Sequence, residues 1–118
     1  MITKRCLDKF VEYGARSVYD AITKMAFGTG SREEKLTDES LENEVYRKEI
    51  AGKIYYSDRI EITAVLMENE VNGYEIKEVG LFDNDGNMYA RKLCIPIYKD
   101  ESKRVWFVYT INYAGGVI

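Results

Sequence analysis

The 118-residue sequence contains no histidine, one proline and only two cysteines. Without histidine, neither a Ser-His nor a Cys-His nucleophile pair can form, which excludes the hydrolases that depend on such pairs. The cysteines, Cys6 and Cys94, lack the paired spacing of a zinc site. We expect two buried, reduced thiols, because cysteine is among the residues most often buried. A disulfide between them also fits the sequence.

Long apolar runs and an excess of positive charge are also missing. No stretch approaches the roughly 18 apolar residues of a membrane span, and Met1-Ile2 is followed at once by polar residues rather than by the apolar run of a signal peptide. The net charge is −3, without the clustered cations that nucleic-acid binding needs. We therefore expect no membrane partner, no nucleic-acid partner and folding in a cytoplasm.

The composition indicates one folded unit. The length predicts a single domain over residues 1–118, and 46% hydrophobic with 31% charged residues is typical of a globular protein. Tyrosine is frequent, with ten copies against four of phenylalanine. Tyrosine is enriched both at interfaces and in strands generally, so this count fits an assembly surface and plain β-propensity equally.

A strand–turn–strand segment organises the second half of the sequence. Asp85 and Gly86 predict its hairpin turn, because both accept the positive φ that tight turns need, and apolar residues flank them on both sides. In a regular strand, Glu78 would lie among apolar neighbours on one face. We expect either a β-bulge near Glu78-Val79-Gly80 that switches the faces, or a buried Glu78 with a cationic partner.

The N-terminal region begins as a helix. Thr3 is a suitable cap for a helix from Lys4, and apolar residues then recur with helical spacing. This period continues to Met25 as one long helix, but Gly14 favours an earlier end, followed by a strand within 18–27. The periodicity leaves both alternatives open.

The remaining sequence is dominated by short strands. Residues 31–43 form a charged stretch typical of an exposed loop, and alternation is clearest at residues 60–66. Residues 105–113 are β-branched and aromatic on both faces, as in a strand covered on both sides. The order predicts an α+β fold in which the N-terminal helix packs on a mainly antiparallel β-sheet or sandwich.

The sequence offers no catalytic, cofactor or metal site. Asp83, Asp85 and Asn87 alternate like a calcium loop, but the glycine and final carboxylate of an EF-hand are misplaced. One polar pair is of structural interest. We predict a salt bridge between Arg47 and Glu78 on neighbouring strands, because a buried carboxylate is costly unless paired. The alternative is that both side chains are exposed.

Three blocks of the sequence, in this order and spacing, resemble the N-terminal domain of phage tail-collar fibre proteins, and the likeness extends over roughly residues 2–113. The blocks are Ile22-Thr23-Lys24-Met25-Ala26-Phe27-Gly28-Thr29-Gly30, Leu41-Glu42-Asn43-Glu44-Val45-Tyr46-Arg47, and Gly73-Tyr74-Glu75-Ile76-Lys77-Glu78-Val79-Gly80-Leu81-Phe82-Asp83 with Asp85-Gly86-Asn87. This resemblance favours the divided N-terminal region, with a helix to about Tyr13 and a strand near 20–27.

The resemblance implies a structural role and no enzymatic activity. The family's N-terminal domain anchors fibres of contractile-tailed phages and related particles to the baseplate. The resemblance therefore implies a protein of the virion tail that is assembled in the host bacterial cytoplasm. It also implies other tail or baseplate proteins as partners, and a homo-oligomer, with a trimer favoured. The sequence differs from the family's pattern in two ways. The family usually has Gly-Asp-Gly where this sequence has Gly28-Thr29-Gly30, and a fibre continues into a shaft, whereas this sequence stops at Ile118. A truncated fibre and a short adaptor both fit.

An assembly surface would use aromatic and apolar residues near the C-terminus, since these are enriched at interfaces. The alternative from another class is a small β-rich ligand- or carbohydrate-binding module that uses exposed tyrosines and the single tryptophan. The candidate interface residues are Trp106, Tyr109, Tyr113, Val117 and Ile118.

Overall fold

A computed structural model describes residues 1–112 of the protein. This part of the chain contains two short helices and seven strands in two antiparallel sheets, which confirms the predicted α+β class. The elements are α1 (Lys4–Tyr13), α2 (Ala15–Ala21), β1 (Lys24–Gly28), β2 (Glu44–Glu49), β3 (Gly52–Tyr55), β4 (Arg59–Leu66), β5 (Tyr74–Phe82), β6 (Met88–Lys99) and β7 (Val105–Asn112).

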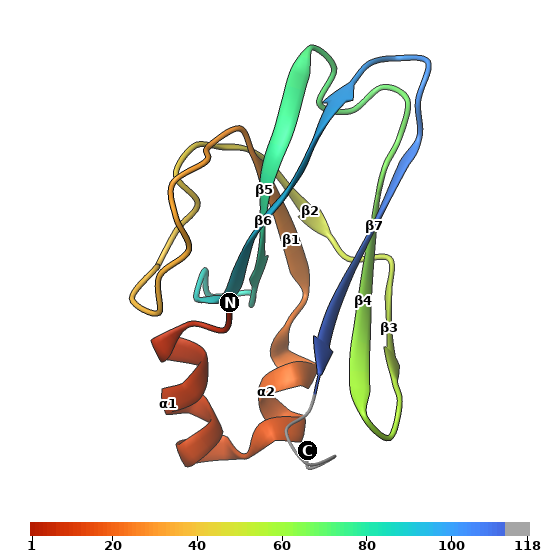
Figure 1. Ribbon diagram of the computed structural model, residues 1–118. Coiled ribbons are helices and arrows are strands. Elements are labelled where there is room, and N and C mark those ends of the chain that lie inside the picture. The colour runs from red at the N-terminus through yellow and green to blue at the C-terminus, as the bar shows by residue number, and fades with distance from the viewer. Residues whose placement is uncertain (113–118) are drawn as a thin grey trace.

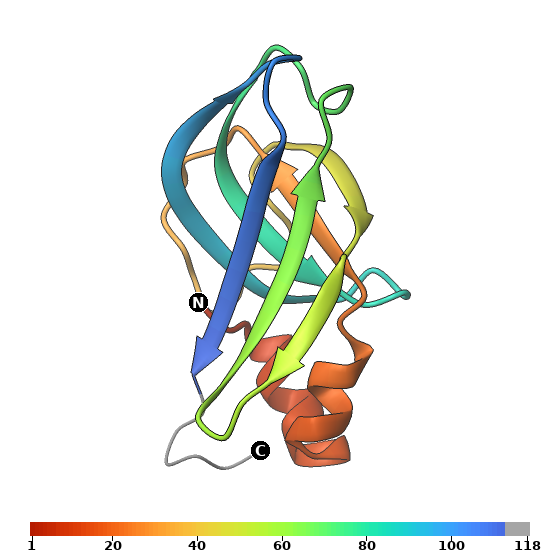
Figure 2. The ribbon, with the colours of Figure 1, turned by 90° about the vertical axis from the view of Figure 1, so that its right-hand side faces the viewer.

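The two sheets face one another as a sandwich. One sheet has four strands in the order β2-β1-β5-β6, and the other has three in the order β3-β4-β7. Both helices lie at one end of the sandwich, the lower end in Figures 1 and 2. The N-terminal region therefore covers an end of the sandwich rather than the middle of a sheet.

The core fills the space between the sheets. On β4, Ile60, Ile62, Ala64 and Leu66 are all fully buried, and the residues between them are partly exposed. This is the pattern expected of a strand with one face in a core. The four-stranded sheet contributes Met25, Phe27, Val79 and Leu81 from the facing side, among others.

The N-terminal region is divided at Gly14, which takes φ 83° between the two helices. The Thr3 hydroxyl caps α1 by accepting a hydrogen bond from the Cys6 N–H at 3.2 Å. The helix ends at Tyr13, close to the predicted end. The predicted strand near 20–27 is too long, because residues 15–21 form α2 and the strand begins only at Lys24.

A long connection covers the outer face of the four-stranded sheet. We call residues 29–43, between β1 and β2, the covering loop; it passes beside β5 and β6 in Figure 1. Leu41 packs with Ala26, Phe82 and Met88 in a second, small apolar cluster. The four-stranded sheet is therefore buried on both faces near its centre.

The hairpin of β5 and β6 contains Asp85 and Gly86 in its connection, with Gly86 at φ 86°. The register of β5 with β6 shifts between Ile76 and Glu78. Ile76 lies in the main core with Val79, although the two differ in parity, so the faces of the strand switch there. Both expected solutions thus occur together, because Glu78 is also buried with a cation.

The two cysteines are free, with Cys6 buried and Cys94 partly exposed. Burial raises the pKa of the Cys6 thiol to about 12. Neither helix in residues 1–112 has the length and apolar character needed to cross a bilayer.

Candidate attachment surface

Glu78 on β5 is a fully buried charged residue, with an exposed fraction of 0%. Its carboxylate accepts hydrogen bonds from the backbone N–H groups of Gly30, Glu42 and Asn43, each at 2.9 Å, and from Arg91 Nε at 3.0 Å. Burial by itself would raise the pKa of Glu78, but these donors outweigh it, and the net shift is downward. The group is therefore held as a carboxylate.

Arg91 on β6 is the cationic partner and is also buried. Its guanidinium contacts Glu78 at 3.0 Å and Asp38 at 3.2 Å. It also donates to the backbone carbonyls of Arg32 and Glu33, at 2.7 and 3.3 Å. Three of these four contacts are to the covering loop. We call Glu78, Arg91 and Asp38 the buried ion cluster; it fastens the loop to the sheet.

The predicted salt bridge between Arg47 and Glu78 is wrong. Arg47 instead pairs with Glu44, three residues earlier on β2, at 2.8 Å, and its guanidinium lies over the ring of Phe82. β1 lies between β2 and β5, so Arg47 and Glu78 are not on neighbouring strands. Arg91 is closer because it lies opposite Gly80, on the same face as Glu78 and diagonal to it.

The identity of this partner was within reach of the sequence. Once the hairpin turn is placed at Asp85 and Gly86, strand pairing brings residues near 91–93 opposite Glu78, and Arg91 is the cation that shares its face. No comparable pattern in the sequence indicates the covering loop, because its three N–H donors come from residues 35 to 48 positions away from Glu78.

The outer face of the three-stranded sheet carries exposed apolar side chains. Trp106 and Val108 on β7 point away from the core and are 63% and 56% exposed, and Ile54 on β3 is 55% exposed. The sheet of β3, β4 and β7 that carries them is the one nearest the viewer in Figure 2. Exposed apolar patches of this kind mark protein interaction sites.

Tyr109 does not belong to this outer face. It is only 7% exposed and packs in the main core, because the side chains of β7 alternate between the two faces. Burial raises the pKa of its hydroxyl. Three other candidate interface residues, Tyr113, Val117 and Ile118, lie outside the described residues. Of the candidate interface residues, Trp106 is thus the one that the structure places on an outer face.

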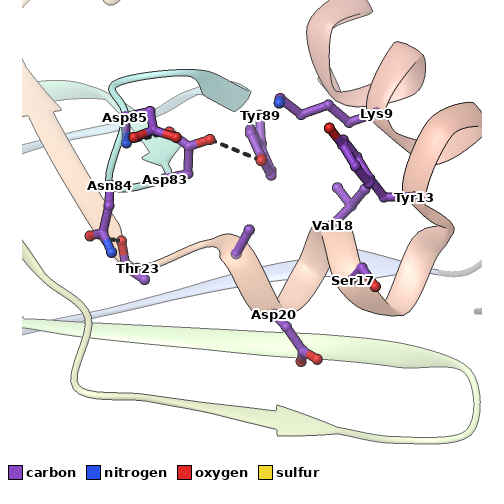
Figure 3. A pocket seen from close by; sticks show the side chains of 11 residues that line it. Lys9, Tyr13, Ser17, Val18, Asp20, Thr23, Asp83, Asn84, Asp85 and Tyr89 are labelled. Carbon is purple, nitrogen blue, oxygen red and sulfur yellow. Dashed lines mark hydrogen bonds between the residues drawn. The ribbon is translucent and has the colours of Figure 1, made fainter.

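A cavity of about 510 Å³ lies between the two helices and the β5–β6 turn (Figure 3). Asp83 borders it, but this carboxylate already accepts hydrogen bonds from the N–H groups of Asp85 and Asn87 and from the Tyr89 hydroxyl. These donors stabilise the turn, so Asp83 offers little to a ligand. Within the described part of the chain, no group of three or more Cys, Asp or Glu side chains is placed to hold a metal ion.

A sandwich with a clamped loop and an exposed apolar sheet face has the features of a structural module. A family model for the N-terminal region of phage tail-collar fibre protein matches residues 1–110. The chain belongs to this family, which makes it a structural protein of the phage virion tail. No curated protein and no solved structure matches the chain.

Proposed function

We propose that the protein attaches tail fibres to the baseplate, or forms part of the baseplate. Family membership supports association with other tail proteins. The observation that carries the more specific role is the exposed outer face of the three-stranded sheet, with Trp106 and Val108 on β7. A rigid sandwich with such a face can act as a passive mount, because its apolar side chains lose contact with water when a neighbour covers them.

The proposal extends to the whole sequence. Residues 1–118 act as one attachment unit that assembles in the host cytoplasm and joins the tail without catalysing a reaction. The copies associate as a homotrimer, with Trp106 among the contacts. The buried ion cluster supports this role because it holds the covering loop in one conformation. An attachment domain transmits force better when its loops are fixed.

The test combines particle composition with light scattering. Deleting the gene from the producing cells should give tail particles without fibres, and the wild-type protein supplied in trans should restore them. Light scattering of the purified chain should give a molar mass three times the 13.7 kDa of one chain. A stable monomer that binds sugars and does not enter tail particles would contradict the proposal and favour a carbohydrate-binding module.

A further inference from the structure

The strand β7 has an unusually unprotected edge. In the three-stranded sheet it pairs with β4, and no strand in residues 1–112 pairs with its other side. Alternate N–H and C=O groups of an edge strand point outward and can accept another strand. The eight residues of β7 include no charged residue, proline or glycine.

The other three edge strands are protected in ordinary ways. β2 carries four charged residues among six, and β3 is only four residues long. β6 contains Pro96 and a shifted register. Charges, proline, irregularity and shortness are the devices that keep sheet edges from pairing with other chains. β7 uses none of them.

Part of the free edge of β7 borders a groove. The four-stranded sheet is one strand wider than the three-stranded sheet, and in Figure 2 the middle of β6 lies outside the free edge of β7. A groove of about 340 Å³ runs there. It is lined by residues 109–112 of β7 and by Met1, Ile2, Glu34 and Lys92. A groove bounded on both sides admits an extended segment more readily than the edge of a second folded sheet.

The charges of the groove define what the segment should carry. Glu34 is already used, because its two carboxylate oxygens accept hydrogen bonds from the Met1 amino group at 3.1 Å and the Leu93 N–H at 3.0 Å. Lys92 is exposed, lies 5.9 Å from the centre of the Tyr109 ring, and forms no salt bridge with any described residue. Among the described residues, the groove therefore presents one positive charge without a paired carboxylate.

We propose that this groove binds an extended segment of another tail protein, which adds to β7 as the fourth strand of the three-stranded sheet. The segment alternates apolar residues and places a carboxylate beside Lys92. Main-chain hydrogen bonds to β7 supply affinity, and the Lys92 contact supplies register and specificity. This inference rests on the proposed attachment role and names a second surface, beside the outer sheet face, through which that role is performed.

The test uses two pairs of exposed-residue variants, supplied in trans to cells whose own gene is deleted, with the amount of chain per purified tail particle as readout. Lys92→Glu reverses the groove charge, and Lys35→Glu makes the same change on the exposed covering loop. Val108→Lys protects the β7 edge, and Val11→Lys makes the same change at an exposed valine of α1, away from the exposed sheet face.

We expect Lys92→Glu and Val108→Lys each to lower incorporation about tenfold or more, as loss of roughly 1.4 kcal/mol of binding free energy would do, and both controls to assemble normally. Hydrogen exchange over residues 105–112 should be slower in wild-type particles than in the isolated chain. Circular dichroism checks that the variants are folded. If Val108→Lys does not fold, Lys92→Glu still tests the inference.

Two results would overturn the inference while leaving the attachment role intact. One is wild-type incorporation of both folded variants. The other is normal incorporation of Lys92→Glu together with loss of self-association by Val108→Lys in light scattering, which would assign the edge to a second copy of this chain. Absence of the wild-type protein from particles would instead contradict the attachment role itself.

Discussion

At the scale of single residues, the arrangement around Glu78 explains how a charged side chain can occupy the centre of a strand that is otherwise apolar. A buried ion pair gains little net stability over an apolar pair, but removing one partner leaves an uncompensated charge. Glu78 and Arg91 are both almost fully buried, and each also bonds to backbone groups of the covering loop. The main effect of the buried ion cluster is therefore to hold the covering loop in one conformation.

Replacing the buried Arg91 should lower the free energy of unfolding far more than replacing Arg47, the partner predicted from the sequence. We expect Arg91→Met to lower the free energy of unfolding by about 3–5 kcal/mol, because Glu78 and Asp38 lose their partner. Arg47→Met, which removes only a partly exposed pair and a ring contact, should cost about 1 kcal/mol. Urea unfolding followed by circular dichroism measures both. Equal costs would contradict the assignment of partners.

A second residue-scale prediction concerns acid stability. Burial alone would raise the pKa of Glu70, but hydrogen bonds from Lys48, the Tyr46 hydroxyl and the Met67 N–H prevail and lower it to about 2. A carboxylate whose pKa is depressed in the folded state stabilises fully above its unfolded pKa, about 4.5, and this contribution is lost as the pH falls to about 2.

Glu70→Gln should accordingly be less stable than wild type at pH 7 and should approach it below about pH 3. Thermal unfolding measured across this range checks the prediction. A difference between the two proteins that stays constant with pH would show that Glu70 does not contribute through its charge.

At the scale of elements, the covering loop and the strands below it approach unusually closely. A Cβ placed on Gly28 would lie 2.5 Å from Glu78 Oε2 and 2.6 Å from the Asn43 carbonyl oxygen. Gly28 and Gly30 therefore leave the space that the Glu78 carboxylate needs to reach the loop backbone. This gives a physical reason for glycines in the Gly28-Thr29-Gly30 block, whatever residue stands between them.

We expect Gly28→Ala to destabilise the protein by about 1–3 kcal/mol, because backbone as well as side-chain atoms must shift. Gly52 is a matched glycine on β3 with no neighbouring atom within 4 Å of an added Cβ, so Gly52→Ala should change stability by less than about 0.5 kcal/mol. Limited proteolysis should cut the covering loop faster in Gly28→Ala alone. Similar behaviour of both variants would contradict the steric explanation.

At the scale of the whole molecule, the two sheets differ in what covers them. The four-stranded sheet has the core on one side and the covering loop on the other, whereas the three-stranded sheet carries Trp106 on an outer face that no described residue encloses. Because Trp106 is the single tryptophan, its fluorescence reports on this face alone.

We predict that Trp106 emits as a hydrated indole in the dilute chain and that both a blue shift and weaker quenching by acrylamide accompany trimer formation as the concentration rises. Stern–Volmer quenching alongside light scattering measures this. If acrylamide quenches Trp106 fluorescence equally in the trimer and in the monomer, the contact between copies lies elsewhere.

The sequence by itself determined the α+β class, the capped start of the first helix, and the polar turn between two apolar strands. These features follow from local rules, namely capping, periodicity and the φ preference of glycine, which depend on residues close together in the chain. Local rules also showed that Glu78 would need a partner if it were buried.

Only the tertiary structure decided which partner that was, which sheet each strand joined and which face of β7 remained exposed. Strand order places β1 between β2 and β5, which separates Arg47 from Glu78. The packing of the two sheets covers one face of β7, so that Tyr109 lies in the core while Trp106 points outward. These outcomes depend on contacts between residues far apart in sequence, and no pattern within a single strand specifies its neighbours.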